Sequence, residues 1–204
     1  KEVLNMTYPL RINKVKKYSL DDYLSWPDDE RWEVIDGEAY NMTPSPNTRH
    51  QRIVLNLSRA LENKLAGGPC LTFIAPLDVI FDEYNFVQPD VFVVCDKEKI
   101  KDRIYGAPHL IIEVLSPSTS LKDKREKKQL YERFGVREYI IVHPDELFIE
   151  RYSLDKDRFN EADLLGAEES LTLNCLNGVT IPLWEIFEVS PPEKSAGEDE
   201  DQKD

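Results

Sequence analysis

The sequence lacks the long apolar runs and cysteine patterns that mark several classes of protein. No stretch approaches the ~20 uninterrupted apolar residues of a membrane-spanning helix, so we expect no membrane span. Residues 1–13 hold no continuous apolar segment, which predicts no signal peptide. The three cysteines, Cys70, Cys95 and Cys175, are odd in number and far apart, and they match neither a disulfide framework nor a zinc site. We therefore expect free thiols and a cytoplasmic protein.

Several catalytic signatures are also missing, and positive charge is scarce. The chain has no Ser-His-Asp pattern, no phosphate-binding P-loop and no G-x-G-x-x-G, and His109 and His143 stand alone without an expected role. The net charge is −13, which disfavours a general nucleic-acid binder because phosphate contacts need Lys and Arg. Residues 118–137 are the exception, with seven basic and three acidic side chains. This stretch predicts a local basic face that could guide DNA.

The length of 204 residues fits one domain with two flanking segments. We expect an irregular lead-in over residues 1–17 and a folded domain over residues 18–189. Residues 190–204 are rich in Pro, Glu, Asp and Lys, which predicts a disordered acidic tail.

The apolar pattern predicts an α/β (α+β) fold with a mixed central β-sheet flanked by helices and an additional β-hairpin or meander. Asp36-Gly37 is a strong hairpin signal between two short strands, and Ser19 can cap a short helix that ends by Pro27. Longer helices are expected over residues 47–65 and 121–134, and a short one over 183–186. Strands are expected near residues 70–75, 77–81, 88–95, 108–115, 136–142 and 147–153, with a meander near 171–173 and 179–181. The order strand, helix, strand over residues 108–142 indicates a parallel crossover.

Two acids border the most apolar of these strands. Asp90 precedes the run 91–94, and Glu113 follows the run 110–112. Central strands solvate a carboxylate poorly, and neighbouring acids repel each other unless a cation lies between them. Mg²⁺, with Mn²⁺ as a substitute, fits this requirement. The alternative is that each acid pairs with an arginine or caps a helix, and ion pairs that consume both acids would count against a metal.

Lys127 shares the inward face of the helix over residues 121–134 with the apolar residues three and four positions later. A lysine on a buried face needs an anion, which Asp90 and Glu113 could supply. It could then orient an attacking water or stabilise charge on a phosphate. The alternatives are a lysine that snorkels to solvent, or a simple ion pair with Asp123 one turn earlier.

Four further side chains are weaker candidates for the same site. Glu33 and Glu38 flank the hairpin turn, where they could add a carboxylate to the metal or remain solvated. His50 begins the long helix, and there we expect a structural histidine with satisfied hydrogen bonds. Gln88 could position a substrate or bond the backbone.

Taken together, these segments resemble the Uma-two family of restriction-endonuclease-like proteins, within the PD-(D/E)XK nuclease superfamily. The resemblance covers about residues 18–183, nearly the whole expected domain. The matching motifs are RWEVIDGE (31–38), QPDV (88–91), IEVLSPST (112–119), Asp123 through Lys127 to Tyr131, and GVREYIIV (135–142).

The resemblance implies a Mg²⁺-dependent endonuclease that acts on DNA, with Asp90, Glu113 and Lys127 as catalytic residues. Asp90, Glu113 and the carbonyl of Val114 would hold the metal. The superfamily expects a lysine directly after Glu113-Val114, where this chain has Leu115, and Lys127 is the substitute. The resemblance also implies a homodimer that cuts both strands. A catalytically inactive module that binds nucleic acid or protein is the main alternative, and a hydrolase of small phosphodiesters is a third.

Overall fold

The computed structural model describes residues 16–27, 30–42, 47–115 and 121–193, without the side chains of residues 121–124. The expected lead-in and acidic tail therefore lie mostly outside the described residues, as do Ser116 to Ser120. The helices are α1 (Leu20–Leu24), α2 (Thr48–Leu65), α3 (Leu121–Arg133) and α4 (Leu183–Phe187), with short 3-10 turns at Lys97–Lys99 and Asn174–Leu176. The predicted bounds of α2, α3 and α4 agree with the structure within one residue, and α1 follows its predicted cap, Ser19.

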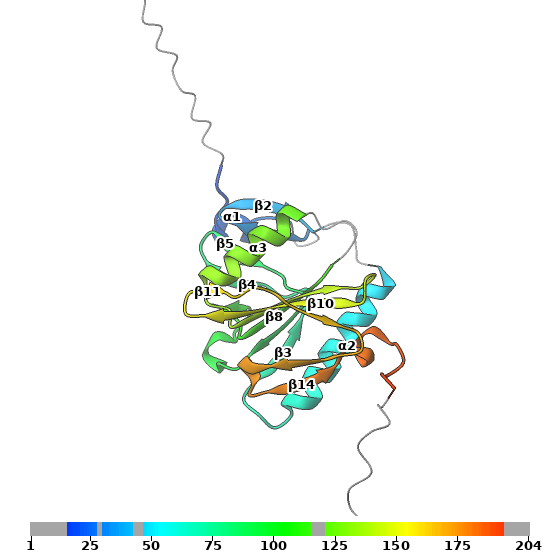
Figure 1. Ribbon diagram of the computed structural model, residues 1–204. Coiled ribbons are helices and arrows are strands. Elements are labelled where there is room, and N and C mark those ends of the chain that lie inside the picture. The colour runs from blue at the N-terminus through cyan, green and yellow to red at the C-terminus, as the bar shows by residue number, and fades with distance from the viewer. Residues whose placement is uncertain (1–15, 28–29, 43–46, 116–120, 194–204) are drawn as a thin grey trace, which may run out of the picture.

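A seven-stranded mixed sheet forms the centre of the molecule, in the order β11-β10-β9-β8-β6-β3 with β12 paired to β10 (Figure 1). Its strands are β3 (Leu71–Ile74), β6 (Val91–Val94), β8 (Leu110–Val114), β9 (Glu138–His143), β10 (Phe148–Asp155), β11 (Arg158–Phe159) and β12 (Asp163–Gly166). Strands β8 and β9 are parallel and α3 connects them, which confirms the predicted crossover. The other neighbours pair antiparallel, so the sheet is mixed as expected.

A second sheet has the order β2-β1-β5-β4-β7, and a separate antiparallel pair follows near the end of the domain. The strands of this second sheet are β1 (Trp32–Ile35), β2 (Glu38–Asn41), β4 (Val79–Asp82), β5 (Asn85–Val87) and β7 (Ile104–Tyr105). The turn at Asp36-Gly37 joins β1 and β2, which confirms the predicted hairpin. The separate pair, β13 (Ser170–Leu173) and β14 (Val179–Pro182), is the predicted meander.

The sequence predicts one strand over residues 88–95. The first half of this prediction is wrong. Strand β5 ends at Val87 in the smaller sheet, and β6 begins at Val91 in the central sheet. Pro89 has no N–H to donate to a strand ladder, which favours a break at this point. The segment Gln88-Pro89-Asp90 therefore crosses from one sheet to the other and brings Asp90 to the edge of the central sheet.

Helices α2 and α3 cover opposite faces of the central sheet (Figure 1). Along β8, Ile112 packs with Leu57 of α2, whereas Ile111 packs with Leu130 of α3. Side chains alternate between the two faces of a strand, so Glu113 faces α3. The smaller sheet packs on this same side, because Ile35 of β1 belongs to the α3-facing core.

Cys70 and Cys95 form a disulfide, so the expectation of free thiols is wrong for this pair, whereas Cys175 is free. Strands β3 and β6 pair with Leu71 opposite Val94, and this register sets the two cysteines opposite each other across 25 residues of sequence. The argument for a cytoplasmic location from free thiols therefore fails. None of the described helices has the length and apolar character needed to cross a membrane.

Candidate active site

The two acids meet at one edge of the central sheet. Strands β6 and β8 pair antiparallel with Val91 opposite Ile112. Extending this register by one residue places Asp90 directly opposite Glu113. Opposed residues of an antiparallel pair lie on the same face of the sheet, with Cα atoms about 5 Å apart. The prediction of two acids on neighbouring inner strands is thus confirmed in position.

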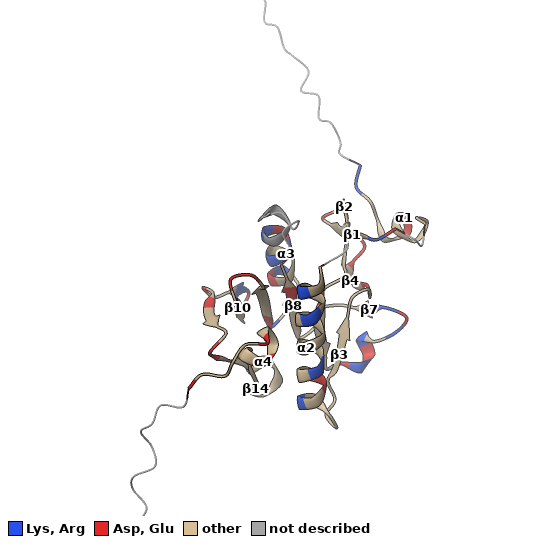
Figure 2. Ribbon diagram, turned by 90° about the vertical axis from the view of Figure 1, so that its right-hand side faces the viewer, with Lys and Arg blue, Asp and Glu red and all other residues tan. Residues whose placement is uncertain are grey.

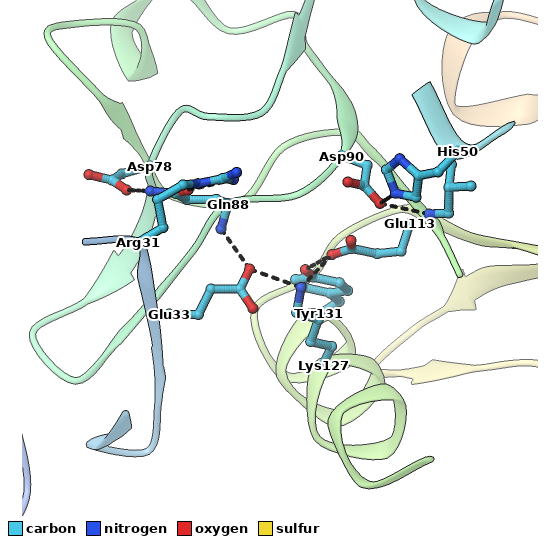
Figure 3. A network of polar contacts seen from close by, with 10 residues as sticks. Arg31, Glu33, His50, Asp78, Gln88, Asp90, Glu113, Lys127 and Tyr131 are labelled. Carbon is cyan, nitrogen blue, oxygen red and sulfur yellow. Dashed lines mark hydrogen bonds and ion pairs between the residues drawn. The ribbon is translucent and has the colours of Figure 1, made fainter. Parts of the chain in front are cut away.

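Lys127 reaches this edge from α3 and bridges two buried carboxylates (Figure 3). Its Nζ lies 3.0 Å from Glu113 Oε1 and 2.9 Å from Glu33 Oε1. The Tyr131 hydroxyl donates to the same Glu113 oxygen at 2.7 Å. Lys127 is 9% exposed, which rules out a lysine that snorkels to solvent. The alternative partner, Asp123, has its side chain outside the described residues.

Asp90 is held by a backbone N–H and by His50 at the start of α2. Its Oδ2 accepts from Val114 N–H at 2.8 Å and lies 3.1 Å from His50 Nε2. His50 is 5% exposed, and its Nδ1 has no hydrogen-bond partner among the described residues. The expectation of a satisfied structural histidine therefore holds for Nε2, which contacts Asp90, whereas Nδ1 has no partner among these residues.

Within the described part of the chain, the hydrogen bonds of each acid involve one oxygen. The contacts of the described residues involve Asp90 Oδ2 and Glu113 Oε1, and none of them reaches Asp90 Oδ1 or Glu113 Oε2. Leu115 donates its N–H to Val142 on β9. In a trans peptide the C=O points opposite to the N–H, so the Val114 carbonyl points toward the Asp90 side. Carboxylate and carbonyl oxygens are ligands that suit Mg²⁺.

The residues therefore fit the expected metal, with a small set of protein ligands. Across the described ranges, no three His, Cys, Asp or Glu side chains are grouped so that they could hold a metal ion. A metal here would take its remaining ligands from the Val114 carbonyl, water and substrate, which is the usual arrangement for Mg²⁺. Within the described residues, the ion pairs of Asp90 and Glu113 do not consume both acids, because they leave one oxygen of each.

Burial and charge fix which of these groups carry protons. Burial raises the pKa of Glu113 to about 7 from its ordinary value of 4.5. Burial alone would favour a neutral Lys127, but the charges of Glu113 and Glu33 outweigh it and raise the pKa of the lysine. Burial and the Glu113 charge also raise the pKa of Tyr131. Both raised pKa values favour the protonated forms, in which Lys127 and Tyr131 donate hydrogen bonds to Glu113.

Gln88 joins this centre to a second polar cluster (Figure 3). Its backbone N–H donates to Glu33 Oε1 at 2.8 Å. Its side-chain Oε1 accepts from Arg31 at 3.0 and 3.1 Å, and its Nε2 donates to Asp78 at 2.9 Å. The Gln88 side chain thus bonds other side chains, and its backbone holds Glu33.

The structure brings Glu33, His50 and Gln88 together with the three main residues. Glu33 is 3% exposed, so the alternative of a solvated hairpin charge is wrong for it. Glu38 is exposed on β2, where it pairs opposite Ile35. Sequence reasoning missed the roles of Tyr131 and Arg31 in this network. Tyr131 lies one helical turn after Lys127, and Arg31 lies two residues before Glu33, so the same spacing rules point to both.

The predicted basic face of residues 118–137 offers less free charge than its sequence suggests. Lys127 is buried in the site, Arg133 pairs with Asp36 at 2.9 Å, and Lys128 lies 3.8 Å from the centre of the Tyr152 ring. Figure 2 shows further Lys and Arg along α2. On α2, Arg49 and Arg52 also pair with acids, Asp145 and Glu188.

Comparison with known proteins gives a family and a fold. The model of the Uma2 family, described as "Putative restriction endonuclease", matches residues 20–184. An uncharacterized protein of Synechocystis sp. is 32% identical over 146 residues, which are 69% of this chain and 76% of that protein. A crystal structure titled as "a putative nuclease belonging to DUF820" from Anabaena variabilis matches with a TM-score of 0.71 and 18% identity, covering 83% of this chain and 97% of that chain. The shared fold agrees with the mixed α+β architecture expected from the sequence.

Proposed function

This chain belongs to the Uma2 family of restriction-endonuclease-like proteins, and from that premise we propose that it is a Mg²⁺-dependent endonuclease that hydrolyses phosphodiester bonds of DNA. The observation that carries the proposal is the convergence of Asp90, Glu113 and Lys127 at one edge of the sheet, with one oxygen of each acid left without a bond within the described structure. Two cuts in a duplex need two sites, which a homodimer would supply. Chromosomal or foreign DNA as substrate would place the protein in the cytoplasm.

Asp90, Glu113 and the Val114 carbonyl would hold the metal ion. When bound, Mg²⁺ supplies Lewis acidity toward a phosphate oxygen and toward water. His50 and the Val114 N–H fix Asp90 Oδ2, which leaves Asp90 Oδ1 for the ion. Tyr131 and Lys127 fix Glu113 in the same way through Oε1.

Lys127 would contribute positive charge and hydrogen-bond donors at the scissile phosphate. Glu33 and Glu113 raise the pKa of its ammonium and so favour the charged form. A preorganised cation in a buried site stabilises the charge that develops on the phosphoryl group in the transition state. Lys127 thereby fills the role of the lysine that Leu115 replaces.

The test is cleavage of supercoiled plasmid and labelled oligonucleotides with Mg²⁺, with Mn²⁺ and with a chelator. We expect the wild type to cut with either metal, and we expect Asp90→Asn and Glu113→Gln to lose activity by a factor of roughly 100 or more. Glu98→Gln is the matched control, because Glu98 is an exposed acid in a 3-10 turn away from the site.

The outcomes separate the alternatives. Cleavage that survives Asp90→Asn and Glu113→Gln would show that the site is assigned wrongly. A folded wild type that neither cuts nor binds Mn²⁺ would identify an inactive nuclease-fold module. Hydrolysis of small phosphodiesters without cleavage of DNA would identify a hydrolase of another substrate class.

A further inference from the structure

Arg31 is a cation beside the active centre whose hydrogen bonds go to a neutral group. Its Nε and Nη2 both donate to the side-chain oxygen of Gln88, at 3.1 and 3.0 Å. Within the described parts of the chain, no carboxylate forms an ion pair with Arg31. Arg103 and Arg133, by contrast, each pair with an aspartate at 3.0 Å or less. The positive charge of Arg31 is thus uncompensated by any acid among these residues.

Its position is fixed by a buried support. Gln88 is 8% exposed, and its Nε2 donates to Asp78 at 2.9 Å. Asp78 is held in turn by the Tyr23 hydroxyl at 3.1 Å and by Arg103 at 3.0 Å. An arginine that only covers the surface would not need an oriented amide on a buried chain of hydrogen bonds. The support leaves Nη1 of Arg31 without a bond in the described structure.

The side chain of Arg31 lies on the side of the hairpin that faces the active centre. Arg31 directly precedes β1, and its carbonyl accepts from the Met42 N–H at 2.9 Å, so the hairpin pairing continues and Arg31 shares a face with Glu33 two residues later. Figure 3 shows the Arg31 side chain extending from β1 above Glu33, toward the side of the network where Asp90 lies. The backbone of Gln88 links the two residues, since it donates to Glu33.

The charges of this network favour a bound monoanion. Glu33, Asp90 and Glu113 contribute three negative charges when ionised, whereas Lys127 and Arg31 contribute two positive charges. A divalent cation changes the balance from one net negative to one net positive charge. One phosphodiester group would neutralise the site, and the planar guanidinium fork suits its two free oxygens.

We propose that Arg31 binds a backbone phosphate of the nucleic-acid substrate next to the scissile group, with Gln88 and Asp78 holding the guanidinium in place. This inference rests on the proposed function, because it names the part of the substrate that the same centre holds. Gln88 is a positioning residue in this account, and Arg31 is the residue that touches the substrate.

Fluorescence anisotropy of a short labelled DNA duplex tests the inference, with Ca²⁺ in place of Mg²⁺ to prevent cleavage and with salt varied. Arg31→Ala should weaken binding roughly 10- to 100-fold, as expected for loss of a hydrogen bond to a charged group. The slope of log affinity against log salt should fall by about one in magnitude. Arg31→Lys should keep that slope and part of the affinity, because it keeps the charge but loses the fork.

Arg158→Ala is the matched control, because it removes an exposed arginine on β11 at the opposite end of the central sheet. Thermal unfolding of each variant checks that the fold is retained. If the wild type binds and cuts DNA but Arg31→Ala behaves like Arg158→Ala, the phosphate assignment is overturned and the nuclease proposal stands. Loss of cleavage with unchanged affinity and salt slope would also overturn it, since Arg31 would then only support Glu33. A wild type that neither binds nor cuts DNA would remove the proposed function and this inference with it.

Discussion

Replacement of Lys127 by methionine isolates the electrostatic core of the site. Methionine keeps much of the side-chain volume but removes the ammonium that lies 2.9 Å from Glu33 and 3.0 Å from Glu113. The side chains of these two carboxylates are only 4% and 12% exposed. Breaking a buried ion pair costs about 3–5 kcal/mol, because it leaves an uncompensated buried charge. For a domain of this size, that loss corresponds to a fall in Tm of roughly 6–20 °C.

The loss should depend on pH, and the sign can be worked out. Burial already raises the pKa of Glu113 to about 7, and loss of the neighbouring ammonium raises it further. An acid whose folded pKa exceeds its unfolded value destabilises the fold as pH rises above the unfolded value. The destabilisation of Lys127→Met should therefore be small near pH 4.5 and large at pH 8. Mn²⁺ should restore part of the stability at pH 8, because a divalent ion replaces the missing charge.

Thermal unfolding followed by circular dichroism at several pH values measures this effect. Lys128→Met is the control, because it makes the same change in charge on the same helix. Lys128 lies over the Tyr152 ring, and its loss should cost about 1 kcal/mol or less. If the two variants lose the same stability, or if Lys127→Met shows no pH dependence, the reasoning about a buried charge cluster is refuted.

Three further predictions concern the neighbours of Glu113 and Asp90. Tyr131→Phe removes a buried hydrogen bond of 2.7 Å to Glu113. It should lower the free energy of unfolding by about 1–3 kcal/mol in urea titrations, and a change near zero would contradict a stabilising role for this bond. His50→Ala should weaken Mn²⁺ binding about 10- to 100-fold in calorimetry, because Asp90 loses its orienting partner, and an unchanged affinity would contradict that role. Mn²⁺ affinity of the wild type should fall as pH drops below about 7, since protons compete for Glu113, and a flat profile between pH 6 and 8 would argue against Glu113 as a ligand.

The main helices and the hairpin could be predicted because their signals are local. The apolar spacing along α2, the cap at Ser19 and the turn at Asp36-Gly37 each depend on neighbouring residues. The acid pair followed from the same logic, since an acid beside an apolar strand needs a partner wherever that strand is buried. The apolar spacing of α3 likewise places Lys127 on the inward face without knowledge of its partners.

The features that were missed depend on contacts between distant segments. The disulfide between Cys70 and Cys95 requires the register of β3 against β6, which the spacing of the cysteines does not reveal. From the sequence, Glu33 could be a solvated charge beside the hairpin turn. In the structure it is buried, because β1 pairs with β5 and faces α3. The partners of Asp90 and Arg31 lie 40 and 57 residues away along the chain.

A crystal soaked in Mn²⁺ and measured at an anomalous wavelength tests the central claim most directly. The account predicts one anomalous peak roughly 2 Å from an oxygen of Asp90, an oxygen of Glu113 and the Val114 carbonyl. Lys127 should keep its contact with Glu113 in that crystal. A peak on other residues, or none at saturating Mn²⁺, would contradict the proposal that this edge of the sheet is a metal-dependent active site.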